Sequence, residues 1–155
     1  MLIHKLNVRG SYWASEVTFD YGTNKTTRVD FMKFEPANNT TSGLEKGIFI
    51  CYEIKSSLED YRSHSGHNFF GEKNYYVMPM GVWNKLKGKY SVPHNIGCYV
   101  PVPKNRDTHD EYINPTSLEK ATIKSWELRC VSRSNQINRE YSNLVCLFNM
   151  FRSGR

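Results

Sequence analysis

Short stretches of alternating apolar and polar residues mark the first half of the chain. Residues 16–21 (EVTFDY) and 28–34 (RVDFMKF) alternate in this way, and the connector between them is rich in turn-forming residues. Because alternation sends every second side chain to the same face of a strand, these segments are predicted to form a β-hairpin. Residues 35–47 are polar and rich in Gly, Asn and Thr, which predicts an exposed loop. Residues 48–55 (IFICYEIK) contain the β-branched and aromatic residues of a third strand.

A helix is expected directly after this third strand. Ser56 with Glu59, or Ser57 with Asp60, has the spacing of a capping box. The residue pattern then predicts a loop over residues 64–73, a short buried strand over 74–79 and a short helix over 80–90. A further strand is expected within residues 91–103, followed by a loop over 104–115.

The C-terminal third is predicted to be helical. Thr116 and Glu119 have the spacing of another capping box. One helical face, expected to pack on the sheet, collects the apolar residues Ile137, Tyr141, Leu144, Val145 and Phe148. No internal repeat or linker divides the chain, so residues 1–155 are predicted to form a single α/β domain.

Composition narrows the class of protein without identifying it. Apolar residues make up 39% of the 155 residues, which is ordinary for a globular domain. No stretch approaches the roughly 18 apolar residues of a membrane span, so we expect a cytoplasmic protein without a membrane partner. The four cysteines are scattered without a C-x-x-C pair, which favours free thiols over a zinc ribbon or a disulfide framework.

Positive charge is concentrated in the second half of the chain. Residues 1–77 contain nine Lys or Arg and nine Asp or Glu, so the other twelve basic and six acidic residues lie in 78–155. A basic half is a typical footprint of nucleic-acid binding. The candidate phosphate contacts are Lys85, Lys87 and Lys89, together with Arg129 and Arg133, which the predicted helix places one turn apart. The alternative is that these basic residues form surfaces that contact only solvent.

Polar residues in two of the predicted strands suggest a chemical site. Glu53 and Lys55 are two positions apart and therefore share one face of the third strand. The second strand carries Asp30, and if the two strands are neighbours in register, the Asp30 and Glu53 carboxylates converge. Two carboxylates suit a hard cation such as Mg²⁺ or Mn²⁺, which can polarise a phosphate and help to generate hydroxide. The Lys55 ammonium would lie close enough to orient the attacking water.

These residues, followed by a capped helix, resemble the active-site signature of the PD-(D/E)XK nuclease superfamily. Within that superfamily, SSLEDYRS, NFFGEKNYYVMP and HNIGCYVPV are similar to the MmcB-like DNA-repair proteins and to small phage or prophage relatives. The resemblance covers roughly residues 10–103 and implies a restriction-endonuclease-like core of order α-β-β-β-α-β, a mixed central sheet flanked by helices. It assigns Asp30 and Glu53 as metal ligands and Lys55 as the catalytic lysine, with Glu16 as the candidate additional acidic ligand. Val29 stands where the signature has proline, and no long first helix is evident.

The resemblance implies a Mg²⁺- or Mn²⁺-dependent nuclease acting on DNA in repair, recombination or phage DNA processing, with a homodimer as one possible assembly. The alternative is a catalytically inactive protein of the same fold that binds DNA or blocks a host protein. The simplest structural alternative is a cross-strand salt bridge between Asp30, Glu53 and Lys55 on a solvated sheet face. His64 and His67 flank a glycine in what is predicted to be a polar loop, because zinc-site companions are missing.

Overall fold

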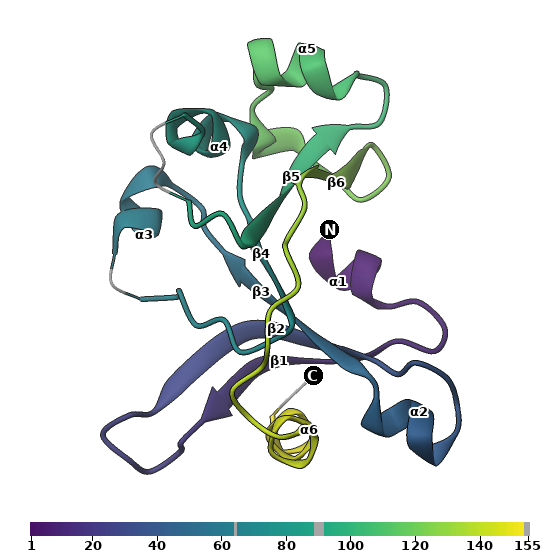
Figure 1. Ribbon diagram of the computed structural model, residues 1–155. Coiled ribbons are helices and arrows are strands. Elements are labelled where there is room, and N and C mark those ends of the chain that lie inside the picture. Colours follow the sequence, from purple (N-terminus) through teal and green to yellow (C-terminus); the bar gives the residue numbers. More distant parts are fainter. Residues whose placement is uncertain (64, 89–91, 154–155) are drawn as a thin grey trace.

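The computed structural model describes residues 1–63, 65–88 and 92–153, so His64 and Lys89 lie outside the described residues. Six strands form one mixed sheet in the order β1-β2-β3-β4-β5-β6 (Figure 1). Their bounds are Tyr12–Phe19 for β1, Thr27–Glu35 for β2, Ile48–Ile54 for β3, Lys73–Val77 for β4, Ile96–Pro103 for β5 and Trp126–Ser132 for β6. Strands β3, β4 and β5 run parallel to one another, whereas the pairs β1–β2, β2–β3 and β5–β6 are antiparallel.

Helices lie on both faces of this sheet. Their bounds are Leu2–Leu6 for α1, Thr41–Glu45 for α2, Leu58–Arg62 for α3, Met80–Leu86 for α4, Thr108–Ile113 for α5 and Asn143–Arg152 for α6, with a 3₁₀ turn at Leu118–Lys120. Figure 1 shows α1 across β3 and β4 from α3 and α4. The predicted α/β class, a mixed sheet flanked by helices, is confirmed. No helix among the described residues is long and apolar enough to span a membrane.

Alternation along the strands divides the core between the two faces. Tyr52 and Tyr75 pack with the apolar residues of α1 on one face. On the other face, Tyr76 packs with α3 and α4, and Cys51 packs with α6. The side chains of Glu53 and Lys55 therefore belong to the face that α3, α4 and α6 cover.

Most of the locally encoded elements are confirmed. The hairpin, the third strand, the strand around Tyr76, the helix α4 and the strand β5 all overlap the predicted segments, although β1 begins at Tyr12, four residues before the segment predicted for it. Helix α3 follows β3 directly, and of the two possible caps it uses Ser57, whose hydroxyl accepts a hydrogen bond from the backbone N–H of Asp60 at 3.1 Å. All four cysteines are free thiols, as expected, although Cys130 is exposed.

Two segments predicted to be loops contain short helices. Helix α2 lies within residues 35–47, where the Thr40 hydroxyl accepts a hydrogen bond from the backbone N–H of Gly43. Helix α5 lies within residues 104–115 and begins after Asp107, whose carboxylate accepts from the backbone N–H of His109. Both helices are too short for a 3.6-residue periodicity to show in the sequence, so only their caps could have indicated them.

The prediction of a helical region from residue 116 onward holds for α6 but is wrong for most of residues 116–142. Residues Trp126–Ser132 form the edge strand β6, in which Trp126 lies opposite Pro103 of β5. Thr116 does not cap a long helix, because its hydroxyl and backbone N–H both donate to the buried carboxylate of Glu111. A neighbouring strand that offers a full ladder of hydrogen bonds has overridden the local preference.

The predicted apolar face of the last helix is also wrong. Ile137 and Tyr141 precede α6, and the side chains that α6 buries are Cys146, Asn149 and Met150. Leu144 and Phe148, which were expected to pack on the sheet, are 78% and 58% exposed. The helix therefore has a second apolar face that no described part of the chain covers.

Candidate functional site

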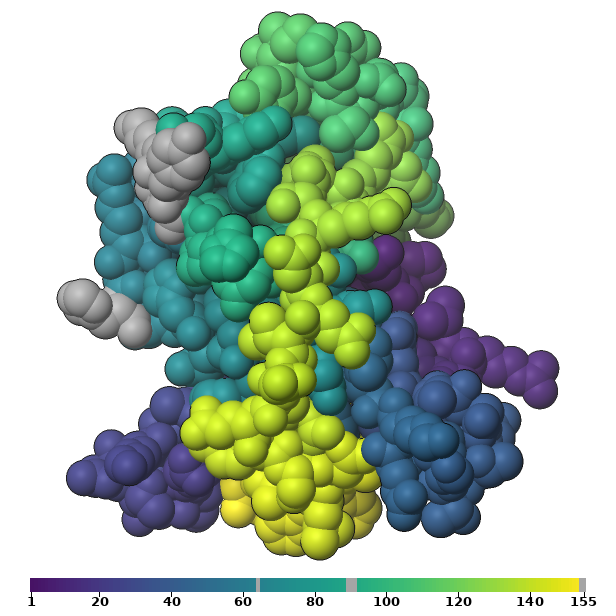
Figure 2. Space-filling model, viewed as in Figure 1, coloured from purple at the N-terminus to yellow at the C-terminus, as the bar shows by residue number. Residues whose placement is uncertain are grey.

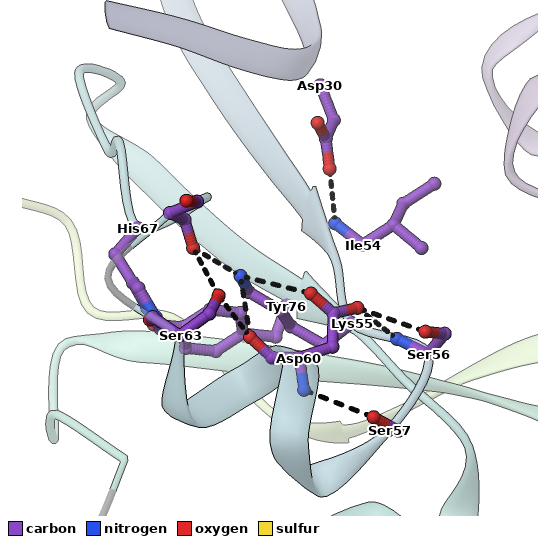
Figure 3. A network of polar contacts seen from close by, with 10 residues as sticks. Asp30, Ile54, Lys55, Ser56, Ser57, Asp60, Ser63, His67 and Tyr76 are labelled. Atoms are coloured by element: carbon purple, nitrogen blue, oxygen red, sulfur yellow. Dashed lines mark hydrogen bonds and ion pairs between the residues drawn. The ribbon is translucent and has the colours of Figure 1, made fainter.

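Asp30 lies where strands β2 and β3 separate. Their ladder ends at the pair Phe31 and Tyr52, and the next positions in the same register are Asp30 and Glu53. Beyond this point the backbone N–H of Ile54 donates to Asp30 Oδ2 at 2.8 Å, as Figure 3 shows. A side-chain carboxylate therefore replaces the backbone acceptor that a continued ladder would supply, and it holds Asp30 beside Glu53.

Glu53 is fully buried, and neither of its carboxylate oxygens has a hydrogen-bond partner within the described part of the chain. The pKa of Glu53 is raised to about 8, mainly by burial and secondly by the negative charge of the nearby Asp30 carboxylate. The Lys55 ammonium partly offsets this rise in pKa, as does the Asn68 backbone N–H, which approaches the carboxylate without forming a well-aligned hydrogen bond. A buried carboxyl group without a hydrogen-bond partner is costly, because its desolvation is not compensated.

Lys55 shares the face of Glu53, as predicted, whereas Ile54 between them is 42% exposed. The Lys55 side chain is only 2% exposed, and its Nζ donates to the carbonyl oxygens of Ser65 at 2.6 Å and Asp60 at 3.4 Å. Asp60 Oδ1 lies 3.8 Å from the same Nζ. An ammonium group has three hydrogens, so one donor remains for another acceptor.

The start of α3 fixes the position of Asp60. Its Oδ2 accepts hydrogen bonds from the backbone N–H and the hydroxyl of Ser56 (Figure 3), and these bonds hold the pKa of Asp60 below its usual value. The same carboxylate therefore terminates β3, anchors α3 and supports Lys55. The capping sequence that was predicted as a helix start is also part of the wall of the site.

The segment after α3 packs over Glu53 and Lys55. Gly66 has φ +66°, and a Cβ there would lie 2.7 Å from Lys55 Nζ and 3.1 Å from Glu53 Oε2. A glycine is needed both for the left-handed backbone and for the close approach. The Asn68 side chain donates to the Arg28 carbonyl at 2.9 Å, which ties this segment to β2.

His67 anchors the same segment to the sheet. Its Nε2 lies 3.0 Å from the carbonyl oxygen of Ser63, so Nε2 carries the proton and donates. Its Nδ1 then accepts from the Tyr76 hydroxyl, with the two atoms 2.6 Å apart (Figure 3). Sequence reasoning assigned no role to Gly66, Asn68 or His67. In the sequence, the available signal was Gly66 between polar residues, which indicates a turn. Only the fold shows that this turn lies over Glu53 and Lys55.

An open pocket of about 430 Å³ adjoins this arrangement. Glu53 does not line it, because its side chain is completely covered. The lining comes from the hairpin, the ends of β2 and β3, and the segment over Lys55: Thr26, Thr27, Arg28, Asp30, Ile54, Lys55, Asp60, Ser65, Gly66 and Asn68. The pocket beside Asp30 and Glu53 is therefore lined by cationic, anionic and hydroxyl-bearing residues.

Glu16, the predicted additional ligand, does not join Asp30 and Glu53. Its Oε2 lies 2.7 Å from a guanidinium nitrogen of Arg28, and both of these side chains are more than half exposed. Glu16 has φ +55°, which interrupts the alternation of β1 and turns its side chain outward. Among the described residues, no three His, Cys, Asp or Glu side chains are grouped closely enough to hold a metal ion.

The candidate phosphate contacts are dispersed. Lys85 on α4 and Lys87 directly after it are exposed, and the Lys87 ammonium lies over the Tyr112 ring at 4.9 Å. Arg129 belongs to β6 and donates to Glu127, Thr108 and the Arg106 carbonyl, whereas Arg133 follows the strand and is exposed. The expected one-turn spacing of Arg129 and Arg133 is wrong because this segment is extended.

The donor chemistry at Asp30 and Glu53 fits a small divalent cation. The two unpartnered Glu53 oxygens need a positive charge or hydrogen-bond donors, and Asp30 retains a second carboxylate oxygen beyond the one bound to Ile54. Carboxylate oxygens are the ligands that Mg²⁺ and Mn²⁺ prefer. Comparisons of the chain with models of protein families, with curated proteins and with solved structures find no match.

Proposed function

We propose that this protein is a metal-dependent DNA nuclease that hydrolyses phosphodiester bonds. The observation that carries the proposal is the buried, unpartnered Glu53 carboxylate beside Asp30, with the Lys55 ammonium on the same face. A cross-strand salt bridge on a solvated face does not account for it, because Glu53 and Lys55 are buried and Glu53 makes no ion pair within 4.0 Å among the described residues. The element order through β4 supports the proposal, because it is that of a restriction-endonuclease-like core apart from the additional short helix α2 between β2 and β3.

In this proposal each side chain has a separate task. Asp30 and Glu53 would hold Mg²⁺ or Mn²⁺, which would supply Lewis-acid activation of the scissile phosphate and of the attacking water. Lys55 is already anchored by two carbonyl oxygens, so its remaining N–H can hold the attacking water or a phosphate oxygen. Arg28, whose largely exposed side chain lines the open pocket, is placed to contact the DNA backbone.

The pocket size agrees with a nucleotide unit as the bound group, since small-ligand sites measure roughly 300 to 1,000 Å³. The exposed basic residues Lys85, Lys87 and Arg133 are proposed to contact phosphates farther along the DNA. Their exposure leaves them free to do so, whereas Arg129 is engaged by neighbouring groups of the protein.

The test is cleavage of duplex, single-stranded, flapped and branched DNA with Mg²⁺ or Mn²⁺, and with EDTA. We expect divalent-dependent cleavage that falls by about 100-fold or more in Glu53→Gln and in Lys55→Met, because each removes a group that acts on the reacting atoms. Lys46→Met, at an exposed lysine that ends α2, is the matched control for charge, and its cleavage rate should stay within a few-fold of wild type. Cleavage that survives Glu53→Gln unchanged would contradict the assignment.

The second candidate function is a non-catalytic DNA-binding protein. The complete burial of Glu53 beneath Gly66 favours it, because a cation reaches Glu53 only if the covering segment shifts. Thermal unfolding separates the two candidates. A cation that binds only the folded chain raises its melting temperature by mass action. The nuclease predicts such a rise with Mn²⁺ and its loss in Glu53→Gln, whereas DNA binding with neither cleavage nor a metal-induced rise supports the non-catalytic protein.

A further inference from the structure

Helix α6 is apolar on two sides, yet the described residues of the chain cover only one of them. Seven of its ten residues, in NLVCLFNMFR, are apolar. Cys146 and Met150 pack against the strands of the hairpin and β3. Away from the sheet, Leu144, Leu147, Phe148 and Phe151 are 78%, 36%, 58% and 90% exposed. These four residues, here called the α6 stripe, follow the i, i+3, i+4, i+7 spacing of a helix-packing surface.

The α6 stripe has the character of an interface and not of a solvated helix face. A helix that is apolar all round is normally buried, and contiguous exposed apolar patches of this kind mark interaction sites. Figure 2 shows the C-terminal segment lying across the front of the molecule, between the β1–β2 hairpin and α2. We propose that the α6 stripe is the interface of a two-fold symmetric homodimer, with the two α6 helices packed antiparallel.

The exposed area is appropriate for self-association. Since a fully exposed leucine or phenylalanine presents on the order of 200 Å², the α6 stripe offers roughly 500 Å² of apolar surface. Tyr21 and Leu44, which are 74% and 44% exposed, extend this patch, because the Arg152 guanidinium lies over the Tyr21 ring and the Asn143 side chain donates to the Leu44 carbonyl. Specific complexes bury about 800 Å² per partner, so two such surfaces reach the size that a stable dimer needs.

Charges at the two ends of α6 select the antiparallel arrangement. Arg152 at the C-terminal end has no carboxylate partner among the described residues, and Glu140, which precedes the N-terminal end, makes no ion pair with them. Antiparallel packing brings Arg152 of one protomer toward Glu140 of its partner, whereas parallel packing aligns like charges. The helix dipoles also favour the antiparallel pair. The interface is isologous, so it closes at two copies.

Sedimentation velocity over a concentration series tests the dimer. We expect a species of twice the 18.1 kDa chain mass. The double substitution Leu144→Glu, Phe151→Glu should weaken the dimer dissociation constant by about 100-fold or more, because it places charges in an apolar contact. Both positions are largely exposed, so circular dichroism should show an intact fold. Ile113→Glu, at a position 68% exposed on α5, is the matched control and should remain dimeric.

Cysteine cross-linking tests the orientation. In a Cys130→Ser background, Phe148→Cys lies near the two-fold axis and should form a disulfide-linked dimer on oxidation, whereas Leu144→Cys should not. Equal cross-linking at both positions would show parallel helices and overturn the orientation. A wild-type monomer at about 100 µM, or a dimer that persists in the double variant, would overturn the interface. A monomer that floats with phosphatidylserine–phosphatidylcholine vesicles would assign the α6 stripe to a membrane surface instead.

Discussion

The carboxyl group of Glu53 makes the stability of the fold depend on pH. Its pKa rises from an ordinary value of 4.5 in the unfolded chain to about 8 in the folded protein. The folded state therefore binds a proton that the unfolded state has already lost, and this proton stabilises the fold. The stabilisation is fully present below pH 4.5 and disappears as the pH rises through about 8.

The expected magnitude follows from the difference between the folded and unfolded pKa values of Glu53. A tenfold change in a protonation equilibrium corresponds to about 1.4 kcal/mol, so the unfolding free energy should fall by roughly 5 kcal/mol across the whole interval. Glu53→Gln removes the titrating proton. When the pH is raised from 5.5 to 7.5 in EDTA, the unfolding free energy of the variant should therefore increase by about 2–3 kcal/mol relative to that of wild type.

Urea denaturation of both proteins at several pH values, followed by circular dichroism, provides the assay. Glu53→Leu is the matched control, because it lacks the proton and the hydrogen-bonding groups, and it should show the same change relative to wild type. The absolute stability of either variant does not matter, since only the difference across pH is diagnostic. If the profiles of wild type and both variants run parallel, Glu53 is not held protonated by burial and the reasoning is refuted.

Two further substitutions test the packing of Gly66 over the site and the ion pair between Glu72 and Arg139. Gly66→Ala should lower the unfolding free energy by about 2 kcal/mol or more in urea denaturation, because the left-handed backbone and the clash with the groups beneath both disfavour a methyl group. Gly88→Ala has a similar positive φ, and no atom of the described residues lies within 4 Å of the added methyl group, so it should show only the backbone part; equal losses would contradict the clash. Glu72→Ala should lower the unfolding free energy by about 3 kcal/mol, because it leaves the largely buried Arg139 without its carboxylate and removes the acceptor of the Phe49 backbone N–H. A loss of unfolding free energy below about 1 kcal/mol would show that the ion pair is dispensable.

The amino-acid sequence by itself determined the elements whose signals are local. Alternation specified the hairpin and the third strand, and the spacing of Ser57 and Asp60 specified the start of α3. The same alternation placed Glu53 and Lys55 on one face, and it made Asp30 a neighbour once β2 and β3 paired in register. Apart from the pairing of β2 with β3, these features follow from backbone geometry over a few residues, so no tertiary contact was needed to predict them.

Tertiary structure decided the features that depend on distant partners. Residues 126–132 are extended because β5 offers them a ladder, and α6 turns Leu144 outward because a different face fits the sheet. Glu16 is directed away from Asp30 by a positive φ, and Glu53 is buried because Gly66 lies over it. Burial and pairing across the chain carry free energies that exceed local preferences, and a sequence pattern does not record which distant residue covers a side chain.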